Sequence, residues 1–353
     1  MKIAILSFYS GHVSRGVESF VHEIASKLSG TAEITVYQAG PKSKSSYPVI
    51  SLPFKLYLPS KARPSPLSYL YLTPSSFQIK RFIFKVLKQF KSDPPDILMP
   101  LNNGWMSLFS KIFCLKHKTK LILPGFSGIG WDDRVNLWLN PDVFIACTDY
   151  QAQWAKKINP RANVKAINIG VNTDRFKPEG KKFKTKLKPP IVLSVAGPQK
   201  YKRIDLAIQA VNQLRNASLL VVGQQPANIN QLGEKLLGSR YQNIQVDYQN
   251  LDPVYRAADI FTLPSESHEA YGISILEALA SNLPVVVNRD EIRKELVGHI
   301  GLLVDPTDLN QYTQALKTAL NKNFGNRPRQ QALKFSWDAI ANQYLKLWQS
   351  LVN

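Results

Sequence analysis

One stretch of about thirty residues, Asp259–Asn288, constrains the fold of this chain more than any other. It begins with a short apolar run, Ile260–Leu263, closed by a Pro-Ser pair, which is typical of a buried parallel strand that ends in a loop. Gly272 then lets the backbone approach a ligand closely, and the helix-forming residues Ile273–Ser281 follow it. A second short apolar run ends the stretch. The order strand, loop, helix, strand predicts an α/β domain built on a parallel sheet.

Two glutamates flank the junction between this loop and this helix. Glu269 falls in the loop and Glu277, eight residues later, falls on the helix. The helix start between them offers unpaired N–H groups and a partial positive charge, which favour a phosphate. Carboxylates on either side would suit the hydroxyls of a sugar and of a ribose, with a diphosphate between them. Two glutamates at this spacing also occur by chance on solvated helices, so the pair alone leaves that alternative open.

The same block carries a resemblance to a known family. Glu269-x7-Glu277, with Gly272 inside it and Leu283–Val286 after it, resembles the signature of glycosyltransferase family 4, the retaining GT-B enzymes of glycosyl transferases group 1. The resemblance implies that Glu269 contacts the donor sugar and Glu277 the ribose of the nucleotide. It also implies that the amides near Gly272 and Ile273 hold the diphosphate. The donor substrate would be a nucleoside-diphosphate sugar, with no further cofactor.

A basic loop follows the first strand of the second predicted domain, and it contains Lys200, Lys202 and Arg203. A cationic loop before a helix start suits a diphosphate, because helix N–H groups bind its oxygens while Lys and Arg neutralise its charge. Basic loops are also common on protein surfaces. In family 4 an arginine just after the strand and a lysine four to six residues later contact the diphosphate. Lys202 falls at the lysine, but Gly197 stands at the arginine, and whether Arg203 or Lys200 supplies the missing charge stays open.

The N-terminal part contains a second set of candidate residues. The strand Lys2–Ser7, a turn and a helix resemble half of a nucleotide-binding βαβ unit, although most such turns are only connections. In family 4 the corresponding loop carries a Gly-Gly-x-Glu element that faces the donor phosphates, and here only Gly16 can be carried over from it. Many family members also place a histidine beside the sugar in a later loop. This chain has none there, and Asp132 and Asp133 are the nearest polar candidates for contact with an acceptor, with a turn or capping role as the alternative.

The formal net charge of +20 is unusual, and it is concentrated in one region. Residues 41–120 hold fourteen Lys or Arg against only Asp93 and Asp96. This asymmetry implies an anionic partner, which would be a membrane, a nucleic acid or a phosphorylated substrate. Gln78–Lys91 predicts an amphipathic helix with basic outer faces, either packed on the sheet or touching an anionic leaflet. We favour a membrane surface and expect no nucleic acid, because no recognised nucleic-acid motif is present.

The alternation of strands and helices predicts two Rossmann-like domains that face each other across a cleft, the GT-B architecture that the resemblance implies. The expected divisions are an acceptor-side domain over 1–172, a linker over 173–190, a donor domain over 191–335 and a terminal helix over 336–353 that returns to the first domain. Within them we expect no regular element in Pro41–Pro66 and a strand at Ile244–Val246.

Cysteine usage and hydropathy indicate a compartment. Cys114 and Cys147 fit neither a metal site nor a disulfide framework, which favours a reducing environment. No apolar stretch approaches the ~18 residues that span a bilayer. We therefore expect a cytoplasmic protein, peripheral at the inner face of the membrane.

The resemblance, together with these observations, implies a metal-independent, retaining glycosyltransferase of the hexosyltransferase type. It would act on a glycan or lipid-linked acceptor in glycan, lipopolysaccharide-type or glycolipid assembly. Lys202, Arg203 and the amides near Gly272 would stabilise the departing diphosphate through preorganised charges, while Glu269 orients the sugar. No Asp-x-Asp motif is present to carry a metal. The alternatives are a nucleotide-sugar epimerase of the same fold, which needs acid and base residues in its cleft, and a basic nucleic-acid-binding protein.

Overall fold

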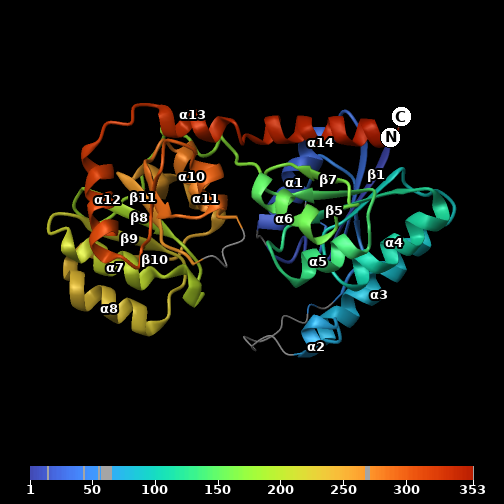
Figure 1. The fold of residues 1–353 in the computed structure, drawn as a ribbon, viewed down its shortest axis with the longest axis horizontal. Helices are drawn as coiled ribbons and strands as arrows, with labels where there is room; N and C mark the ends of the chain where they lie inside the picture. The colour runs from blue at the N-terminus through green and yellow to red at the C-terminus, as the bar shows by residue number, and fades with distance from the viewer. Residues whose placement is uncertain (14–15, 43, 55, 57–65, 267–270, 353) are drawn as a thin grey trace. The chain divides into compact units, whose positions relative to one another are not determined.

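The chain forms two compact units, each built around its own parallel sheet (Figure 1). This computed structural model describes residues 1–13, 16–42, 44–54, 56, 66–266 and 271–352. The first unit comprises Met1–Ile169 and Trp337–Asn353, and the second comprises Gly170–Ser336.

The first unit contains a seven-stranded sheet in the order β3-β2-β1-β4-β5-β6-β7. The strands are β1 (Lys2–Ser7), β2 (Glu33–Gln38), β3 (Val49–Ser51), β4 (Ile97–Pro100), β5 (Lys120–Gly125), β6 (Val143–Ala146) and β7 (Val164–Ala166). Most of the strands in the middle of the sheet are continuous apolar runs that are buried along their length, as expected for parallel strands covered on both faces. The strand order reverses between β1 and β4, so this is the point at which a doubly wound sheet opens a crevice.

Helices cover this sheet, and the last helix of the chain is one of them. They are α1 (Gly16–Leu28), α2 (Pro66–Tyr69), α3 (Pro74–Gln89), α4 (Trp105–His117), α5 (Trp131–Trp138), α6 (Asp149–Ile158) and α14 (Trp337–Val352). Helix α14 packs against α1, where the rings of Phe20 and Tyr344 lie 5.3 Å apart. The ammonium of Lys27 also contacts the carboxylate of Asp338 at 2.6 Å.

Helix α3 is the basic amphipathic helix, and it begins before the expected residue 78. Thr73 caps it, because its Oγ1 accepts a hydrogen bond from the amide of Ser76 at 3.3 Å, and Pro74 suits the first turn. Phe82 and Val86 of its apolar stripe are fully buried in the core of the unit, and Ile79 and Leu87 pack against this core while partly buried. This stripe is therefore occupied by the protein itself, and only the other faces of α3 meet solvent.

The second unit contains a six-stranded sheet in the order β10-β9-β8-β11-β12-β13. Its strands are β8 (Ile191–Val195), β9 (Ser218–Val222), β10 (Tyr241–Ile244), β11 (Ile260–Leu263), β12 (Val285–Asn288) and β13 (Leu302–Val304). Its α-helices are α7 (Ile204–Gln213), α8 (Ala227–Leu237), α9 (Asp252–Arg256), α10 (Ile273–Ala280), α11 (Glu291–Val297), α12 (Leu309–Asn321) and α13 (Arg327–Leu333). Here the strand order reverses between β8 and β11.

Two expected elements were wrong. Residues 41–66 do contain a regular element, because β3 pairs in parallel with β2 at Val36↔Val49. The strand expected at Ile244–Val246 instead runs over β10, which pairs with β9 at Tyr241↔Leu219. Both are short strands at a sheet edge, where pairing with a neighbour decides the bounds more than local hydrophobicity does.

Three further observations concern the cysteines, the helices and the predicted linker. Both Cys114 and Cys147 are free and buried. Within the described ranges, no helix combines the length and the apolar character that crossing a bilayer requires. The start of the predicted linker is held within the second unit by Arg329, whose guanidinium donates to the carbonyl oxygens of Thr173 and Phe176 at 3.1 Å each.

Candidate functional site

The candidate site lies where the strand order of the second sheet reverses. The neighbouring strands β8 and β11 pair at Ile260↔Val192, so the loops that follow them leave the same edge of the sheet. The amide of Glu266 donates to the carbonyl oxygen of Tyr201 at 2.8 Å, which ties the two loops together. In sheets of this kind the ligand binds at the reversal point, outside the carboxyl ends of the strands.

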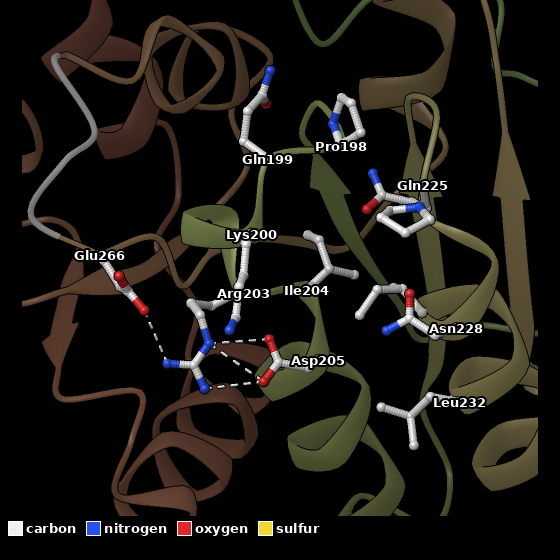
Figure 2. Close-up of a pocket in the computed structure, with 12 residues that line it drawn as sticks. Pro198, Gln199, Lys200, Arg203, Ile204, Asp205, Gln225, Asn228, Leu232 and Glu266 are labelled. Carbon is white, nitrogen blue, oxygen red and sulfur yellow. Dashed lines mark hydrogen bonds and ion pairs between the residues drawn. The ribbon is translucent and has the colours of Figure 1, made fainter. Parts of the chain in front are cut away.

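A cavity of about 870 Å³ opens beside these loops (Figure 2). Its wall includes the loop after β8, the start of α7, the turn after β9 and the start of α8. The first turns of α7 and α8 therefore bring unpaired N–H groups and the positive ends of two helix dipoles to one space. Such a space favours an anionic ligand.

The turn after β9 requires a glycine. Gly223 has a φ of +114°, and a Cβ there would collide with the carbonyl oxygen of Ala196 at the end of β8. The side chain of Gln225 donates to the same carbonyl oxygen at 2.9 Å. The ends of β8 and β9 are thus joined tightly enough to form one wall of the cavity. Our sequence reasoning missed Gln225, although a Gly-Gln-Gln-Pro turn directly after a buried strand was a signal for it.

Arg203 is clamped between two carboxylates (Figure 2). Its Nη2 lies 3.0 Å from Oδ2 of Asp205, and its Nη1 lies 3.2 Å from Oε1 of Glu266. The hydrogen bond to Asp205 raises the pKa of Arg203, so the guanidinium stays charged. The backbone of Arg203 is left-handed, with φ 50° and ψ 42°, which costs roughly 1 kcal/mol for a residue with a Cβ. The clamp joins the loops after β8 and β11 and uses part of the charge of Arg203 to do so.

The two lysines of this loop have different surroundings. Lys200 lines the cavity and is exposed, and its ammonium makes no ion pair or hydrogen bond within the part of the chain that the structure describes. Lys202 ends a short 3-10 turn, and its Nζ lies 5.3 Å from the ring centroid of Tyr201. Lys202 is not among the described residues that line the cavity. Arg203 and Lys200, the two candidates to replace the family arginine, both line the cavity. The charge of Arg203 is partly neutralised by Asp205 and Glu266, whereas Lys200 offers its charge to a ligand.

The start of α10 has the backbone that the sequence predicted. Gly272 precedes the helix with a φ of +91°, and a Cβ there would lie 3.0 Å from Cδ1 of Ile275. A glycine therefore serves this position best. Ile273 is the first helical residue, so its amide belongs to the unpaired first turn. Glu269 lies outside the described residues, and its predicted contact with the donor sugar stays a prediction.

Glu277 is buried in the second unit, with 3% of its surface exposed. The hydroxyl of Tyr255 donates to its Oε2 at 2.7 Å. Burial raises the pKa of Glu277, while hydrogen bonds from Tyr255 and Tyr248 and the charge of Arg175 act in the opposite direction. The alternative of a glutamate on a solvated helix face is wrong for Glu277. Its contact with a ribose stays a prediction, and the carboxylate is already held by tyrosines.

The first unit has a polar edge of its own where its strand order reverses. Gly16 opens α1 on this side of the sheet, and the side chain of Asn102, after β4, accepts from the amide of Phe8 at 2.8 Å. Asn103 donates to Oγ of Ser127 at 2.8 Å. Asn136 donates to Oδ1 of Asn103, also at 2.8 Å. Our sequence reasoning missed this row of amides, for which an Asn-Asn-Gly turn after a buried strand was the signal.

The two adjacent aspartates of this edge have separate roles. Asp133 is 0% exposed, and its Oδ2 accepts from Nε2 of Gln151 at 2.8 Å. Burial raises the pKa of Asp133 well above its ordinary value. Asp133 is therefore part of the scaffold, and the expectation that it contacts an acceptor is wrong because no surface of it is accessible. Asp132 is partly exposed, and it accepts a hydrogen bond from the hydroxyl of Tyr71 at 2.6 Å.

The second unit, which contains this cavity, is similar in sequence to known proteins. Residues 176–335 match the family described as glycosyl transferases group 1. Among curated proteins, the sulfoquinovosyl transferase SQD2 of Arabidopsis thaliana is 26% identical over 195 residues, which are 50% of this chain and 38% of that protein. The aligned part is no more than 54% of the length of the next two curated relatives.

Solved structures extend the likeness to the whole chain. The sucrose-phosphate synthase from Thermosynechococcus elongatus has a TM-score of 0.77 at 19% identity, covering 99% of this chain and 98% of that chain. Anabaena Alr3699/HepE in complex with UDP and glucose has a TM-score of 0.71 at 16% identity, covering 99% and 100%. At these identities the likeness establishes the fold, which is the one expected from the sequence. The chain therefore has the GT-B fold, and its residues 176–335 match the glycosyl transferases group 1 family.

Proposed function

We propose that this protein transfers a sugar from a nucleoside-diphosphate sugar to a hydroxyl acceptor, with retention of the anomeric configuration. The observation that carries the proposal is the cavity beside the reversal point of the second sheet, with Lys200 and Arg203 on its wall and two helix starts next to it. This cavity lies within the group 1 domain. A protein of the same fold, Anabaena HepE, has been solved with UDP and glucose, which makes UDP-glucose the first donor to test.

In this proposal, fixed positive charges stabilise the departing diphosphate. Lys200, Lys202 and Arg203 hold its oxygens together with the amides near Gly272 and Ile273, and no covalent intermediate with the protein is needed. The clamp on Arg203 keeps its guanidinium in one orientation, so little reorganisation is required as charge develops. The same charges favour a nucleoside diphosphate in the ground state as well.

Three further residues have proposed roles around the donor. Glu269 orients the sugar, Glu277 contacts the ribose, and Gly16 lets the backbone of the first unit approach the phosphates. Attack would occur on the face that the diphosphate leaves, with a donor phosphate oxygen taking the acceptor proton. This route retains the anomeric configuration.

We propose that the reaction needs no metal. In the chain outside the undescribed gaps, no group of three or more His, Cys, Asp or Glu side chains is arranged to hold a metal ion. Unchanged turnover in excess EDTA is the expected result, and activity that depends on added Mg²⁺ or Mn²⁺ would contradict it.

Calorimetric titration with UDP, GDP, ADP and their glucose, galactose and mannose derivatives tests the donor assignment. One nucleotide of the panel should bind, and the protein should use the corresponding nucleotide sugar as its donor. NMR should show that the transferred sugar has the same anomeric configuration in the product as in the donor. Substituting Glu269→Ala or Lys202→Ala should lower turnover by at least about tenfold in folded protein. If no member of the panel binds, the assignment fails, and wild-type turnover in either variant removes that residue from the site.

The acceptor is proposed to be a glycan or a lipid-linked acceptor at an anionic membrane, with the protein peripheral at its cytoplasmic face. The basic excess of residues 41–120 supports this proposal. The group 1 match supports glycosyl transfer, and it gives no support to the epimerase alternative. No observation favours nucleic acid as the partner.

A further inference from the structure

The outward side of α3 combines aromatic rings with cations. Phe77, Arg81, Phe84 and Lys88 follow one another at intervals of four, three and four residues, so they share one side of the helix. All four are exposed, and the two phenylalanines are 43% and 44% exposed. The opposite side of α3 packs in the core. The exposed side is therefore a second stripe, of aromatic and cationic residues, separate from the apolar stripe that the sequence pattern revealed.

Neighbouring elements extend this stripe into a larger surface. Helices α2, α3 and α4 lie together in the first unit (Figure 1), and Phe84 contacts Phe109 of α4 with ring centroids 4.4 Å apart. On α4, Leu115 is 71% exposed. On and after α2, four large apolar side chains are exposed: Leu67, Tyr69, Leu70 and Leu72. We call these residues, with the four of α3, the docking face.

The elements that carry the docking face have charges of a single sign. Residues 66–91 and 101–120 contain no Asp or Glu. The two acids between these ranges are turned to the N-terminal strand, where Lys2 pairs with Asp93 at 2.7 Å and its amide donates to Asp96, also at 2.7 Å. Lys116 and Lys118 add exposed cations near Leu115. A surface of exposed aromatic and leucine side chains among cations is complementary to an anionic lipid headgroup layer.

The docking face is also held in shape by hydrogen bonds. The indole of Trp131 donates to the carbonyl oxygen of Tyr69, and the indole of Trp105 donates to that of Tyr71, each at 2.8 Å. The Tyr71 hydroxyl binds Asp132 at 2.6 Å. The ring of Tyr71 lies so close to Gly104 that no Cβ fits between them. This part of the docking face is thus fixed to the sheet edge that carries Asp132.

We propose that the docking face binds an anionic lipid bilayer by inserting its aromatic and leucine side chains at the headgroup level while its cations contact the lipid phosphates. The proposal deepens the membrane part of the proposed function and rests on it. A nucleic acid fits less well, because Leu67, Leu70 and Leu115 offer it neither charge nor a ring to stack on. The bond from Tyr71 to Asp132 would place the acceptor side of the first unit next to the membrane surface.

Flotation with vesicles tests the docking face directly. Wild-type protein should float with phosphatidylcholine vesicles that contain phosphatidylglycerol, and the double variant Phe77→Ala/Phe84→Ala should bind about tenfold more weakly. Arg81→Glu/Lys88→Glu should weaken binding at least as much. Tyr150→Ala and Lys156→Glu/Lys157→Glu are the matched controls, because these side chains are exposed on α6 of the same unit, and both should float like wild type.

Tryptophan fluorescence provides a second readout that does not depend on folding controls. Trp131 and Trp138 are exposed beside the docking face, whereas Trp337 and Trp348 are buried. Lipids brominated near the headgroup should quench the first pair, and Trp131→Phe/Trp138→Phe should remove most of the quenching. Wild-type protein that stays at the bottom of the gradient with every vesicle overturns the proposal. So does equal weakening by the α6 controls, or flotation of Phe77→Ala/Phe84→Ala like wild type.

Donor titration of the same variants separates the two proposals. Phe77→Ala/Phe84→Ala should bind nucleotides as wild type does, because its substitutions lie outside the second unit. Vesicle binding without nucleotide binding would refute the donor assignment and leave the docking face standing. Nucleotide binding without vesicle binding would refute the docking face and leave the donor assignment standing.

Discussion

Lys200 and Arg203 carry the same formal charge, yet their surroundings give them different functions. Arg203 shares its charge with Asp205 and Glu266, and its fork of N–H donors joins two loops. Lys200 stands exposed on the cavity wall, three residues earlier. A phosphate that enters the cavity therefore meets a fixed, partly neutralised cation and a movable, unneutralised one.

Lys200→Ala should weaken binding of the preferred nucleoside diphosphate by about tenfold, because it removes one charge-assisted contact with phosphate. Calorimetry measures this. Lys235→Ala, an exposed lysine on α8, is the control and should change the affinity by less than about twofold. Unchanged affinity in Lys200→Ala would remove Lys200 from the phosphate site and leave Lys202 and Arg203 as its cations.

Asp133 provides a prediction about pH. Burial raises its pKa in the folded protein above the unfolded value, so ionisation of Asp133 destabilises the folded state. The cost is absent below the unfolded pKa and grows as pH rises towards the folded pKa. Asp133→Asn should therefore raise the thermal midpoint at pH 8 and have little effect at pH 4, as measured by differential scanning fluorimetry. A gain that is equal at both pH values would exclude this cause.

At the scale of elements, the shape of the site depends on contacts that join the loops after β8 and β11 to the start of α11. Arg293 of α11 is fully buried. Its Nη1 lies 3.2 Å from Asp290, which caps the same helix, and its Nη2 donates to Oγ of Ser265 at 3.3 Å. Because Glu266 follows directly, Arg293 supports the loop that completes the clamp on Arg203. The start of α11, the loop after β11 and the loop after β8 thus form one connected support.

Arg293→Met should lower the free energy of unfolding by about 3 kcal/mol, since it leaves a charged partner without its cation. Urea unfolding followed by fluorescence measures this change. The free energy of unfolding of Arg293→Lys should lie between those of wild type and Arg293→Met, because a lysine keeps the charge but lacks the planar fork. The neighbouring Lys294→Met is the control, since the Lys294 side chain is 66% exposed, and it should stay within about 0.5 kcal/mol of wild type. Destabilisation of similar size in Arg293→Met and Lys294→Met would count against a role for the buried arginine.

At the scale of the whole molecule, the net charge of +20 should make membrane binding depend on salt. Raising NaCl from about 0.1 M to about 0.5 M shortens the Debye length and screens the cations of the docking face from lipid phosphates. The fraction of protein that floats with anionic vesicles should fall steeply over this range. Binding that ignores salt would mean that apolar insertion suffices without the charges.

The sequence predicted the second unit better than the first, for physical reasons. The strands β8 and β11, the start of α10 and the basic loop were all evident, because buried apolar runs, a glycine and a cation cluster are local signals. The short strands β3 and β10 were missed or displaced because their bounds depend on a partner strand. The clamp of Arg203 by Glu266 spans 63 residues of sequence, and no local pattern announces a contact of that range.

By itself, the sequence determined the alternation of strands and helices, the likeness of residues 176–335 to a glycosyltransferase family and the excess of positive charge, since each follows from residue type and spacing along the chain. Only the tertiary structure decided which charged side chains are accessible. Glu277 and Asp133 are buried, and Lys200 is exposed at a cavity. It also decided that the apolar stripe of α3 belongs to the core, while a stripe of aromatic and cationic residues lies at the surface. Burial depends on what packs against a residue from distant parts of the chain, and that information exists only once the chain has folded.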